Sequence, residues 1–293
     1  MNQRLERFLR LVKARAHLRS MTDRSGSTRQ YFPIREQATQ ELARRAQDAR
    51  ALAGESFQGV CPVCGRAASF DSFNGNLRES GTCSECGSNN RNRQLAALVR
   101  RRFGMRAGGP FRFPARFTVY SAEANGPVHN QLKKLPAYIS SEYWGPEFAP
   151  GQLVNGVRHE DLQRLSFPDS SIDLILSSDV LEHMPDPYAA HAEIHRVLHT
   201  GGRHIFTVPF IVDAPEDDVR ARLEDGKTVH LKEQLFHGDP IRPDEGVLVW
   251  TIFGMEMLTK LNQMGFETTM WLMHEPVHGI LGDGNSIFEA RKI

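Results

Sequence analysis

All four cysteines of this 293-residue chain lie in one short segment, as Cys61-Pro-Val-Cys64 and Cys83-Ser-Glu-Cys86. Two cysteines at this spacing form a tight turn that aims both thiolates at one point. Two such turns supply the tetrahedral sulfur set that Zn²⁺ prefers. Gly65 follows the first pair and Gly87 the second, where such a turn commonly needs a residue that tolerates positive φ. The spacing therefore predicts a zinc ribbon with all four cysteines as ligands.

A closed shell of four cysteines leaves no open coordination position, so the predicted zinc is structural and takes no part in chemistry. Two disulfides are the alternative, which the absence of a recognisable secretion signal disfavours, and a redox CxxC would not need a second copy. We expect short ribbon strands over residues 67–73 and 77–82, and a helix over residues 89–102 that leaves the ribbon.

Charge is distributed unevenly: residues 1–116 carry roughly thirteen more basic than acidic side chains, and the rest carries roughly twelve more acidic than basic. A basic module can be attracted to an acidic one, or it can bind phosphates. Leu5, Phe8, Leu9 and Val12 predict a basic amphipathic helix, for packing on the protein or contact with an anionic membrane surface. The arginines of the ribbon helix are expected to grip a polyanion or to face water: Arg91, Arg93, Arg100, Arg101 and Arg102.

From Arg116 onward, short apolar runs alternate with helical stretches, which predicts an α/β fold with a mostly parallel sheet and helices on both faces. Strands are expected at residues 117–120, 137–141, 172–177, 204–208, 266–273 and 286–290, the last two as an antiparallel edge hairpin. Helices are expected at residues 35–52, 127–135, 187–198 and 255–264.

The predicted organisation is a basic helical segment (1–56), a zinc ribbon (57–90), a connecting helix and linker (91–115) and a larger domain (116–293). Residues 212–245 are too long and polar for a plain connection, and predict a substrate-recognition insert or a surface loop with a short helix over residues 216–223. No run approaches the roughly 20 apolar residues of a spanning helix, so a cytoplasmic location is expected.

Acidic residues recur at successive strand ends of the predicted sheet, where open α/β folds bind ligands. Glu123 follows the first strand, Glu142 the second, and Asp161 and Asp179 lie before and after the strand over residues 172–177. A carboxylate after the second strand can accept hydrogen bonds from two adjacent ribose hydroxyls. Any one of these acids alone is more often a helix cap, but their ordered recurrence indicates a binding site.

The run from Asp161 through Phe167-Pro-Asp169, Asp179-Val-Leu-Glu-His183 and Arg196-Val-Leu to Gly201-Gly202 resembles the central block of class I methyltransferases that use S-adenosylmethionine. The resemblance, to the type 11-like domain, covers residues 116–293 and implies a Rossmann-like sheet. It places Asp161 near the adenine, Glu142 on the ribose, and residues 179–183 along the cleft. The cofactor residues so implied are Glu123, Asn125, Gly126, Glu142, Tyr143, Asp161, Leu162 and Ser178.

The chain departs from that family in the loop after the first strand, where Glu123-Ala-Asn125-Gly126 keeps only one glycine of the usual glycine-rich pattern. Close backbone approach to the methionine part of the cofactor is easier at glycine. A subset of the family combines a zinc ribbon, such a loop, "S-E-Y" after the second strand and an "H-G-D-P" segment, and its members resemble modification enzymes for glycans or small metabolites.

Methyl transfer from a sulfonium needs a positioned nucleophile and often a general base. The candidates for catalysis are His237, which Asp239 could orient, His183 and Asp179. The favoured function is methylation of an O or N atom of a sugar, nucleotide-sugar or other small metabolite. Two alternatives stay open: RNA methylation with the basic half as docking module, and a non-catalytic binding or scaffold protein. Oligomeric state is not indicated.

Overall fold

The computed structural model describes residues 34–212, 214–238, 246–282 and 285–293. The predicted amphipathic helix at the N-terminus and Asp239 lie outside these residues. Within the described part of the chain, no helix combines the length and the apolar character needed to cross a membrane. The segment predicted as a helix over residues 35–52 is helix α2 (Ile34–Leu52).

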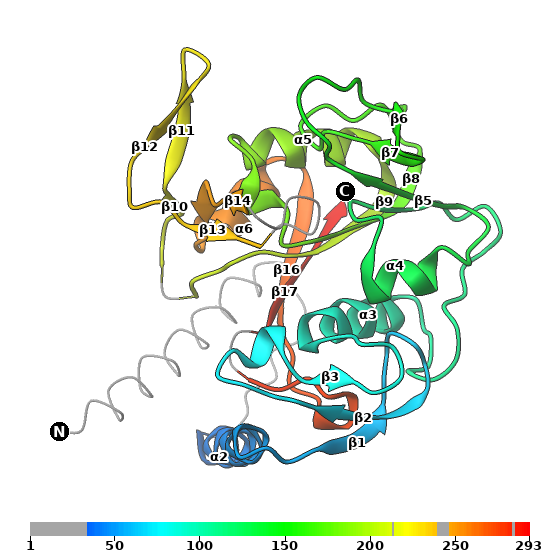
Figure 1. Ribbon diagram of the computed structural model, residues 1–293, viewed down its shortest axis with the longest axis vertical. Helices are drawn as coiled ribbons and strands as arrows, with labels where there is room; N and C mark the ends of the chain where they lie inside the picture. Colours follow the sequence, from blue (N-terminus) through cyan, green and yellow to red (C-terminus); the bar gives the residue numbers. More distant parts are fainter. Residues whose placement is uncertain (1–33, 213, 239–245, 283–284) are drawn as a thin grey trace.

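An eight-stranded sheet organises the larger part of the molecule, in the order β16-β17-β9-β8-β4-β5-β7-β6 (Figure 1). The parallel strands are β4 (Val119–Ser121), β5 (Tyr138–Glu142), β7 (Val157–His159), β8 (Ile172–Ser178) and β9 (Leu198–Thr207). The antiparallel strands are β6 (Leu153–Val154), β16 (Phe266–Leu272) and β17 (Ser286–Lys292). This confirms the predicted Rossmann-like class, although β6 and β7 were not predicted.

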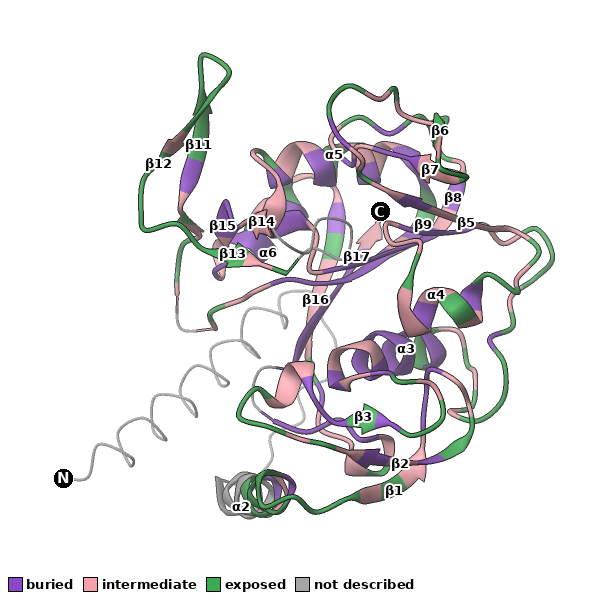
Figure 2. Cartoon of the chain, viewed as in Figure 1, coloured by how far each residue is buried: buried purple, intermediate pink, exposed green. Residues whose placement is uncertain are grey.

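Helices cover both faces of the sheet because successive strand residues point to opposite sides. Leu174 and Leu176 pack on one side with helices α3 (Asn90–Arg102) and α4 (Gly126–Leu132). Ile175 packs on the other side with α5 (Pro187–Val197) and α6 (Glu256–Gln263). Figure 2 shows the buried residues concentrated in the sheet and α3.

The cysteine segment forms a three-stranded antiparallel sheet of β1 (Phe57–Val60), β2 (Ala67–Asp71) and β3 (Thr82–Cys83). The strand expected over residues 77–82 is wrong: a 3-10 helix, η2 (Leu77–Glu79), occupies its first half. Here Ser80 turns back and its hydroxyl donates to the carbonyl of Asn76 at 2.8 Å. Local side-chain bonding of this kind competes with strand pairing.

The ribbon and the large sheet share one core, because the buried residues of β2, α3, β4 and β8 belong to a single apolar cluster. The connection between β16 and β17 reaches back to the ribbon through a 3-10 helix, η4 (Pro276–His278). A side chain at Gly59 would lie 1.9 Å from the carbonyl oxygen of Val277. Only glycine permits this approach. The last two strands are antiparallel as predicted. The segment that connects them packs against the ribbon.

One expectation for residues 212–245 was a short helix over residues 216–223. This prediction is wrong, because the structure has strands there. The segment holds β10 (Asp218–Val219), β11 (Ala221–Glu224), β12 (Lys227–His230) and β13 (Phe236–His237). β13 pairs with β14 (Val247–Leu248), and β10 pairs with β15 (Thr251–Ile252). Figure 1 shows the β11–β12 hairpin projecting from the molecule.

Candidate active site and metal site

The four cysteines converge at one point of the ribbon, as predicted. Their sulfur atoms all lie within 4.8 Å of one another, and the Cys61 and Cys86 sulfurs are 3.8 Å apart. None of the four forms a disulfide. A regular tetrahedron with Zn–S bonds of about 2.3 Å places its sulfurs about 3.8 Å apart. The donor set and its dimensions therefore suit a Zn²⁺ ion.

Both cysteine turns have the same backbone construction. The amide of Gly65 donates to the carbonyl of Cys61 at 2.8 Å, and that of Gly87 donates to Cys83 at 2.9 Å. The φ angles of these glycines are +72° and +71°, in the region that other residues rarely adopt. The predicted need for positive φ is confirmed at both positions.

Two buried arginines of α3 hold the cysteine turns in place. Arg93 is fully buried and donates to the carbonyl of Ser88, next to the second turn, and to Gly279 at 2.8 Å. Arg100 is 2% exposed and donates to the carbonyl of Pro62, inside the first turn, at 2.6 Å. These arginines neither face water nor bind a polyanion, so both expectations for them are wrong.

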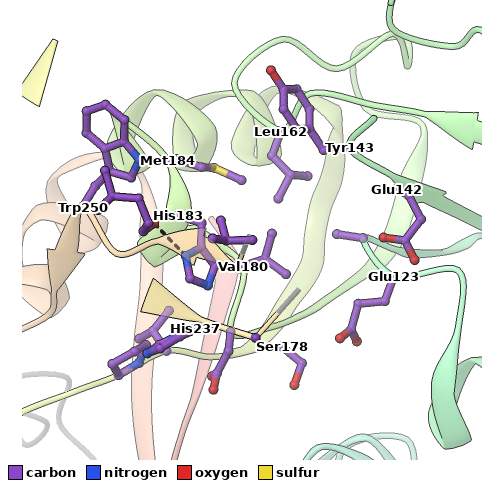
Figure 3. A pocket seen from close by; sticks show the side chains of 18 of the residues that line it. Glu123, Glu142, Tyr143, Leu162, Ser178, Val180, His183, Met184, His237 and Trp250 are labelled. Carbon is purple, nitrogen blue, oxygen red and sulfur yellow. Dashed lines mark hydrogen bonds between the residues drawn. The ribbon is translucent and has the colours of Figure 1, made fainter. Parts of the chain in front are cut away.

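A cavity of about 1270 Å³ opens at the carboxyl ends of β4, β5, β8 and β9. Typical ligand sites measure about 300–1,000 Å³, so the space accommodates two small molecules side by side. Every predicted cofactor-binding or catalytic residue of the described chain except Gly126 lines it. Figure 3 shows Glu123 and Glu142 on one side of this cavity and His183 and His237 on the other.

Glu142 ends β5 and braces the loop after β4. One of its carboxylate oxygens accepts from the backbone amide of Ala124 and from the Asn125 side chain, both at 2.8 Å. Glu123, half-buried in the same loop, has its pKa raised to about 7 by burial, against the opposing charge of Arg91. Gly126 starts α4 with φ +80° and does not line the cavity.

The remaining predicted cofactor residues form the adjacent wall. Asp161 accepts from the amide of Gln163 at 2.9 Å, and buried Leu162 stands beside it. Tyr143 is 44% exposed on the rim. Ser178 ends β8, and its hydroxyl accepts from Arg91. The structure thus brings together side chains that are 55 positions apart in the chain, from Glu123 to Ser178.

Asp179 lies in the cavity wall, and its carboxylate accepts hydrogen bonds from a side chain of the ribbon. Both Nη atoms of Arg78, which is in η2, donate to its carboxylate oxygens at 2.6 Å. Thr207 also donates to it, at 2.9 Å. Burial opposes ionisation of Asp179, but these hydrogen bonds and the charge of Arg91 prevail and hold its pKa well below the usual range. A carboxylate so held is a poor proton acceptor and so a poor candidate for a general base.

His183 and His237, the two histidines selected as catalytic candidates, meet at the far side of the cavity. Their ring centroids are 5.0 Å apart and the rings are nearly perpendicular. Between them lies Glu182, fully buried in a 3-10 helix, η3 (Leu181–His183), with its pKa raised to about 7 by burial. The nearest Glu182 oxygen is 3.5 Å from His237 Nδ1 and 3.7 Å from His183 Nε2.

Sequence reasoning did not place Arg78 among the site residues, and it assigned Arg91 no role in the cleft. It placed Glu182 along the cleft, within residues 179–183, but gave it no chemical role. Arg78 and Asp179 are separated by 101 positions, and Arg91 and Ser178 by 87. No local pattern signals such contacts. The opposite net charges of the two parts of the chain were the available indication, since a basic ribbon here meets an acidic cleft.

Residues 130–206 match the family model described as "Methyltransferase domain". This part of the chain is a methyltransferase domain. The match confirms the predicted enzyme class, an S-adenosylmethionine-dependent methyltransferase, and its residues include the Asp161–Gly202 run on which the resemblance was based. It begins within α4, after the glycine-poor loop.

Solved structures of other methyltransferases are similar to this methyltransferase domain. An S-adenosylmethionine-dependent methyltransferase from Mesorhizobium loti has 16% identity and a TM-score of 0.38, over 61% of this chain and 94% of that one. Burkholderia thailandensis 1,6-didemethyltoxoflavin-N1-methyltransferase has 19% identity and a TM-score of 0.38, over 69% and 77%. Streptomyces venezuelae DesVI has 16% identity and a TM-score of 0.40, over 69% and 90%. No curated protein matches the sequence.

Proposed function

We propose that this methyltransferase holds S-adenosylmethionine along Glu123, Glu142 and Asp161 and transfers its methyl group to an O or N atom of a sugar, nucleotide-sugar or other small metabolite. The observation that carries the proposal is the cavity of about 1270 Å³, with carboxylates at one end and histidines at the other. Its size suits a methyl donor together with a small acceptor.

The donor supplies an electrophilic methyl group when bound. The protein therefore has to bind the donor and the acceptor, orient them toward each other and accept the proton that the acceptor loses. Glu142 accepts from the ribose hydroxyls, as a carboxylate at the end of the second parallel strand does in this kind of sheet. Asp161 and Leu162 contact the adenine. Asn125, Tyr143 and Ser178 complete the donor side. His183 and His237 face the acceptor.

The RNA alternative loses support from the contacts of its proposed docking residues. Arg91 is paired with Glu79 at 2.8 Å and Arg102 with Glu289 at 2.6 Å, while Arg101 bonds to Glu275. The aromatic pair around Arg112 is also occupied: Phe111 lies under Arg100, 4.2 Å from its guanidinium, and Phe113 stacks on Phe117. Side chains used internally are not available to bind phosphates or unstacked bases.

We propose further that the cysteine cluster binds one structural Zn²⁺. The sulfur separations support it, and so do the paired turns and the arginines that anchor them. Metal analysis of the purified protein should return one zinc per chain. Far less than one equivalent, together with disulfide-bonded cysteines, would exclude this assignment.

Calorimetric titration of the zinc-replete protein with S-adenosylmethionine and S-adenosylhomocysteine tests the donor site. We expect micromolar binding that Glu142→Ala weakens at least tenfold, or about 1.4 kcal/mol. Glu147→Ala is the matched control, because Glu147 is exposed in the segment that follows β5 and does not line the cavity. No binding to the intact protein would favour the non-catalytic scaffold instead.

A further inference from the structure

The Glu182–His183–His237 cluster has a feature that the proposed methyl transfer does not require: a buried carboxylate with no hydrogen-bond partner among the described residues. Glu182 is 0% exposed, and neither of its carboxylate oxygens makes a hydrogen bond to any residue that the structure describes. An ionised carboxylate in that position costs several kcal/mol unless a cation or a proton compensates it. Its nearest neighbours are the two imidazoles at 3.5 and 3.7 Å.

The tautomer of His183 gives Glu182 no hydrogen-bond donor on the side that faces it. Its Nδ1 lies 2.9 Å from the backbone carbonyl oxygen of Leu248. A carbonyl only accepts, so Nδ1 carries the proton and Nε2 of the neutral ring presents a lone pair. That lone pair faces the Glu182 oxygen, and two acceptors cannot hydrogen-bond to each other. A positive centre belongs between them.

From this geometry we infer a divalent transition-metal site formed by Glu182, His183 and His237, separate from the cysteine cluster. One ligand atom from each residue lies within 4.8 Å of the others. A tetrahedral ion with bonds of about 2.1 Å spaces its ligand atoms about 3.4 Å apart, close to the observed separations. Donation from the second ring nitrogen to a backbone carbonyl is how metal-bound histidines are commonly oriented.

The surrounding strands hold these ligands in position before any ion arrives. β13 carries His237 and pairs with β14, where His237 is opposite Val247. The next residue of β14, Leu248, is the one that orients His183. The backbone of Glu182 is fixed as well, since the amide of Trp250 donates to its carbonyl at 2.7 Å. The paired strands β13 and β14 therefore fix both imidazoles relative to the buried carboxylate.

Two histidines and one carboxylate are the protein ligands of an open site, in which a further position is left for water or substrate. His183 and His237 line the cavity, so that position faces the acceptor side. A hydroxyl group bound there would lose its proton more readily, and the ion would fix its orientation. This role for the ion rests on the proposed function. Metal binding itself does not.

The test is titration of the zinc-replete protein with Mn²⁺, with free Mn²⁺ measured by its electron paramagnetic resonance signal. Mn²⁺ favours oxygen and nitrogen ligands over thiolates, so the cysteine site does not interfere. We expect one Mn²⁺ per chain, displaced by one added equivalent of Zn²⁺, which binds such ligands more tightly. Glu182→Gln and His237→Ala should each weaken Mn²⁺ binding at least tenfold. His199→Ala should leave it unchanged, since His199 is exposed and away from the cluster.

No Mn²⁺ binding by the intact protein, or binding that Glu182→Gln leaves unchanged, would overturn the metal site and leave a shared proton as the positive centre. Melting temperature and S-adenosylhomocysteine affinity, measured on the same samples, show whether each variant is folded. His183→Ala replaces any variant that is not. Mn²⁺ binding without S-adenosylhomocysteine binding would contradict the proposed function and keep the metal site, so the two failures are distinguishable.

Discussion

Arg78, in the ribbon, donates from both of its Nη atoms to the two carboxylate oxygens of Asp179, in the cleft, at 2.6 Å each. The arginine side chain is 17% exposed and the aspartate 14%, so water screens this pair weakly. Since Arg91 adds its charge to the same carboxylate at 3.5 Å, the ribbon supplies part of the wall of the cavity.

Removing one partner of this pair should destabilise the protein strongly. Arg78→Ala leaves the Asp179 carboxylate largely buried without its main partner, and we expect a loss of about 2 to 4 kcal/mol in urea unfolding. The double variant with Asp179→Asn should recover part of that loss, because the uncompensated charge is gone. If the double variant instead loses the sum of what Arg78→Ala and Asp179→Asn each lose alone, the pair contributes no coupling energy.

The same pair predicts an acid-dependent loss of stability. Asp179 has a folded-state pKa held below its ordinary value, so its contribution is present above the unfolded pKa of about 3.9 and disappears as the pH falls through the folded value. The free energy of unfolding of the intact protein should therefore fall more steeply below about pH 4 than that of Asp179→Asn. Parallel curves for the two proteins in this range would contradict the prediction.

Glu123 should produce the opposite pH dependence. Burial raises its pKa to about 7, so the unfolded chain ionises first as the pH rises from about 4.5, and stability is lost up to about pH 7. Glu123→Gln should accordingly stabilise the protein at pH 8, by about 1 to 3 kcal/mol, and have little effect at pH 4.5. Thermal melts of both proteins across this range measure the difference. Stabilisation of the same size at both pH values would point to packing instead of ionisation.

The sheet could be predicted because its elements carry strong local patterns. The apolar run that became β8 is buried on both faces, and the helix α5 begins at Asp186-Pro187, an N-cap residue followed by proline. The missed strands also had a local signal. Asn155-Gly156 connects β6 to β7 and Asp225-Gly226 connects β11 to β12, all with positive φ. Such pairs are typical of two-residue hairpin turns.

From the strand pattern alone, the site was predictable only where its residues follow strands. Glu142 and Ser178 end β5 and β8, and parallel strands bring their carboxyl ends to one edge of a sheet. Arg78 and Arg91 come from a different substructure, and their position depends on how the ribbon packs on the sheet. That Glu182 is buried with no hydrogen-bond partner among the described residues depends on tertiary packing, which no sequence spacing reveals.

Arg93 should be essential to the zinc ribbon although it touches no cysteine. It is fully buried, it bonds to Ser88 and Gly279, and its guanidinium lies 4.6 Å from the ring centre of Phe70. Arg93→Ala removes the donor to the Gly279 carbonyl and one of the two donors to the Ser88 carbonyl, which also accepts from the amide of Cys83 at 2.9 Å. We therefore expect a loss of about 3 kcal/mol or more and faster release of zinc to a chromogenic chelator. Arg112→Ala, at an exposed position, is the control. Unchanged zinc release in Arg93→Ala would show that this arginine does not stabilise the metal site.

Zinc removal should weaken the methyl-donor site, because the ribbon delivers Arg78 and Arg91 to the cavity wall. Arg91 bonds to Ser178, a predicted donor residue, and its charge acts on Glu123. We expect Cys64→Ser, which breaks the sulfur set, to lower the affinity for S-adenosylhomocysteine at least tenfold, or about 1.4 kcal/mol. Arg91→Ala in the zinc-replete protein should reproduce much of that loss. If Cys64→Ser loses its zinc but binds S-adenosylhomocysteine as the intact protein does, the ribbon and the donor site are energetically independent, whatever their proximity.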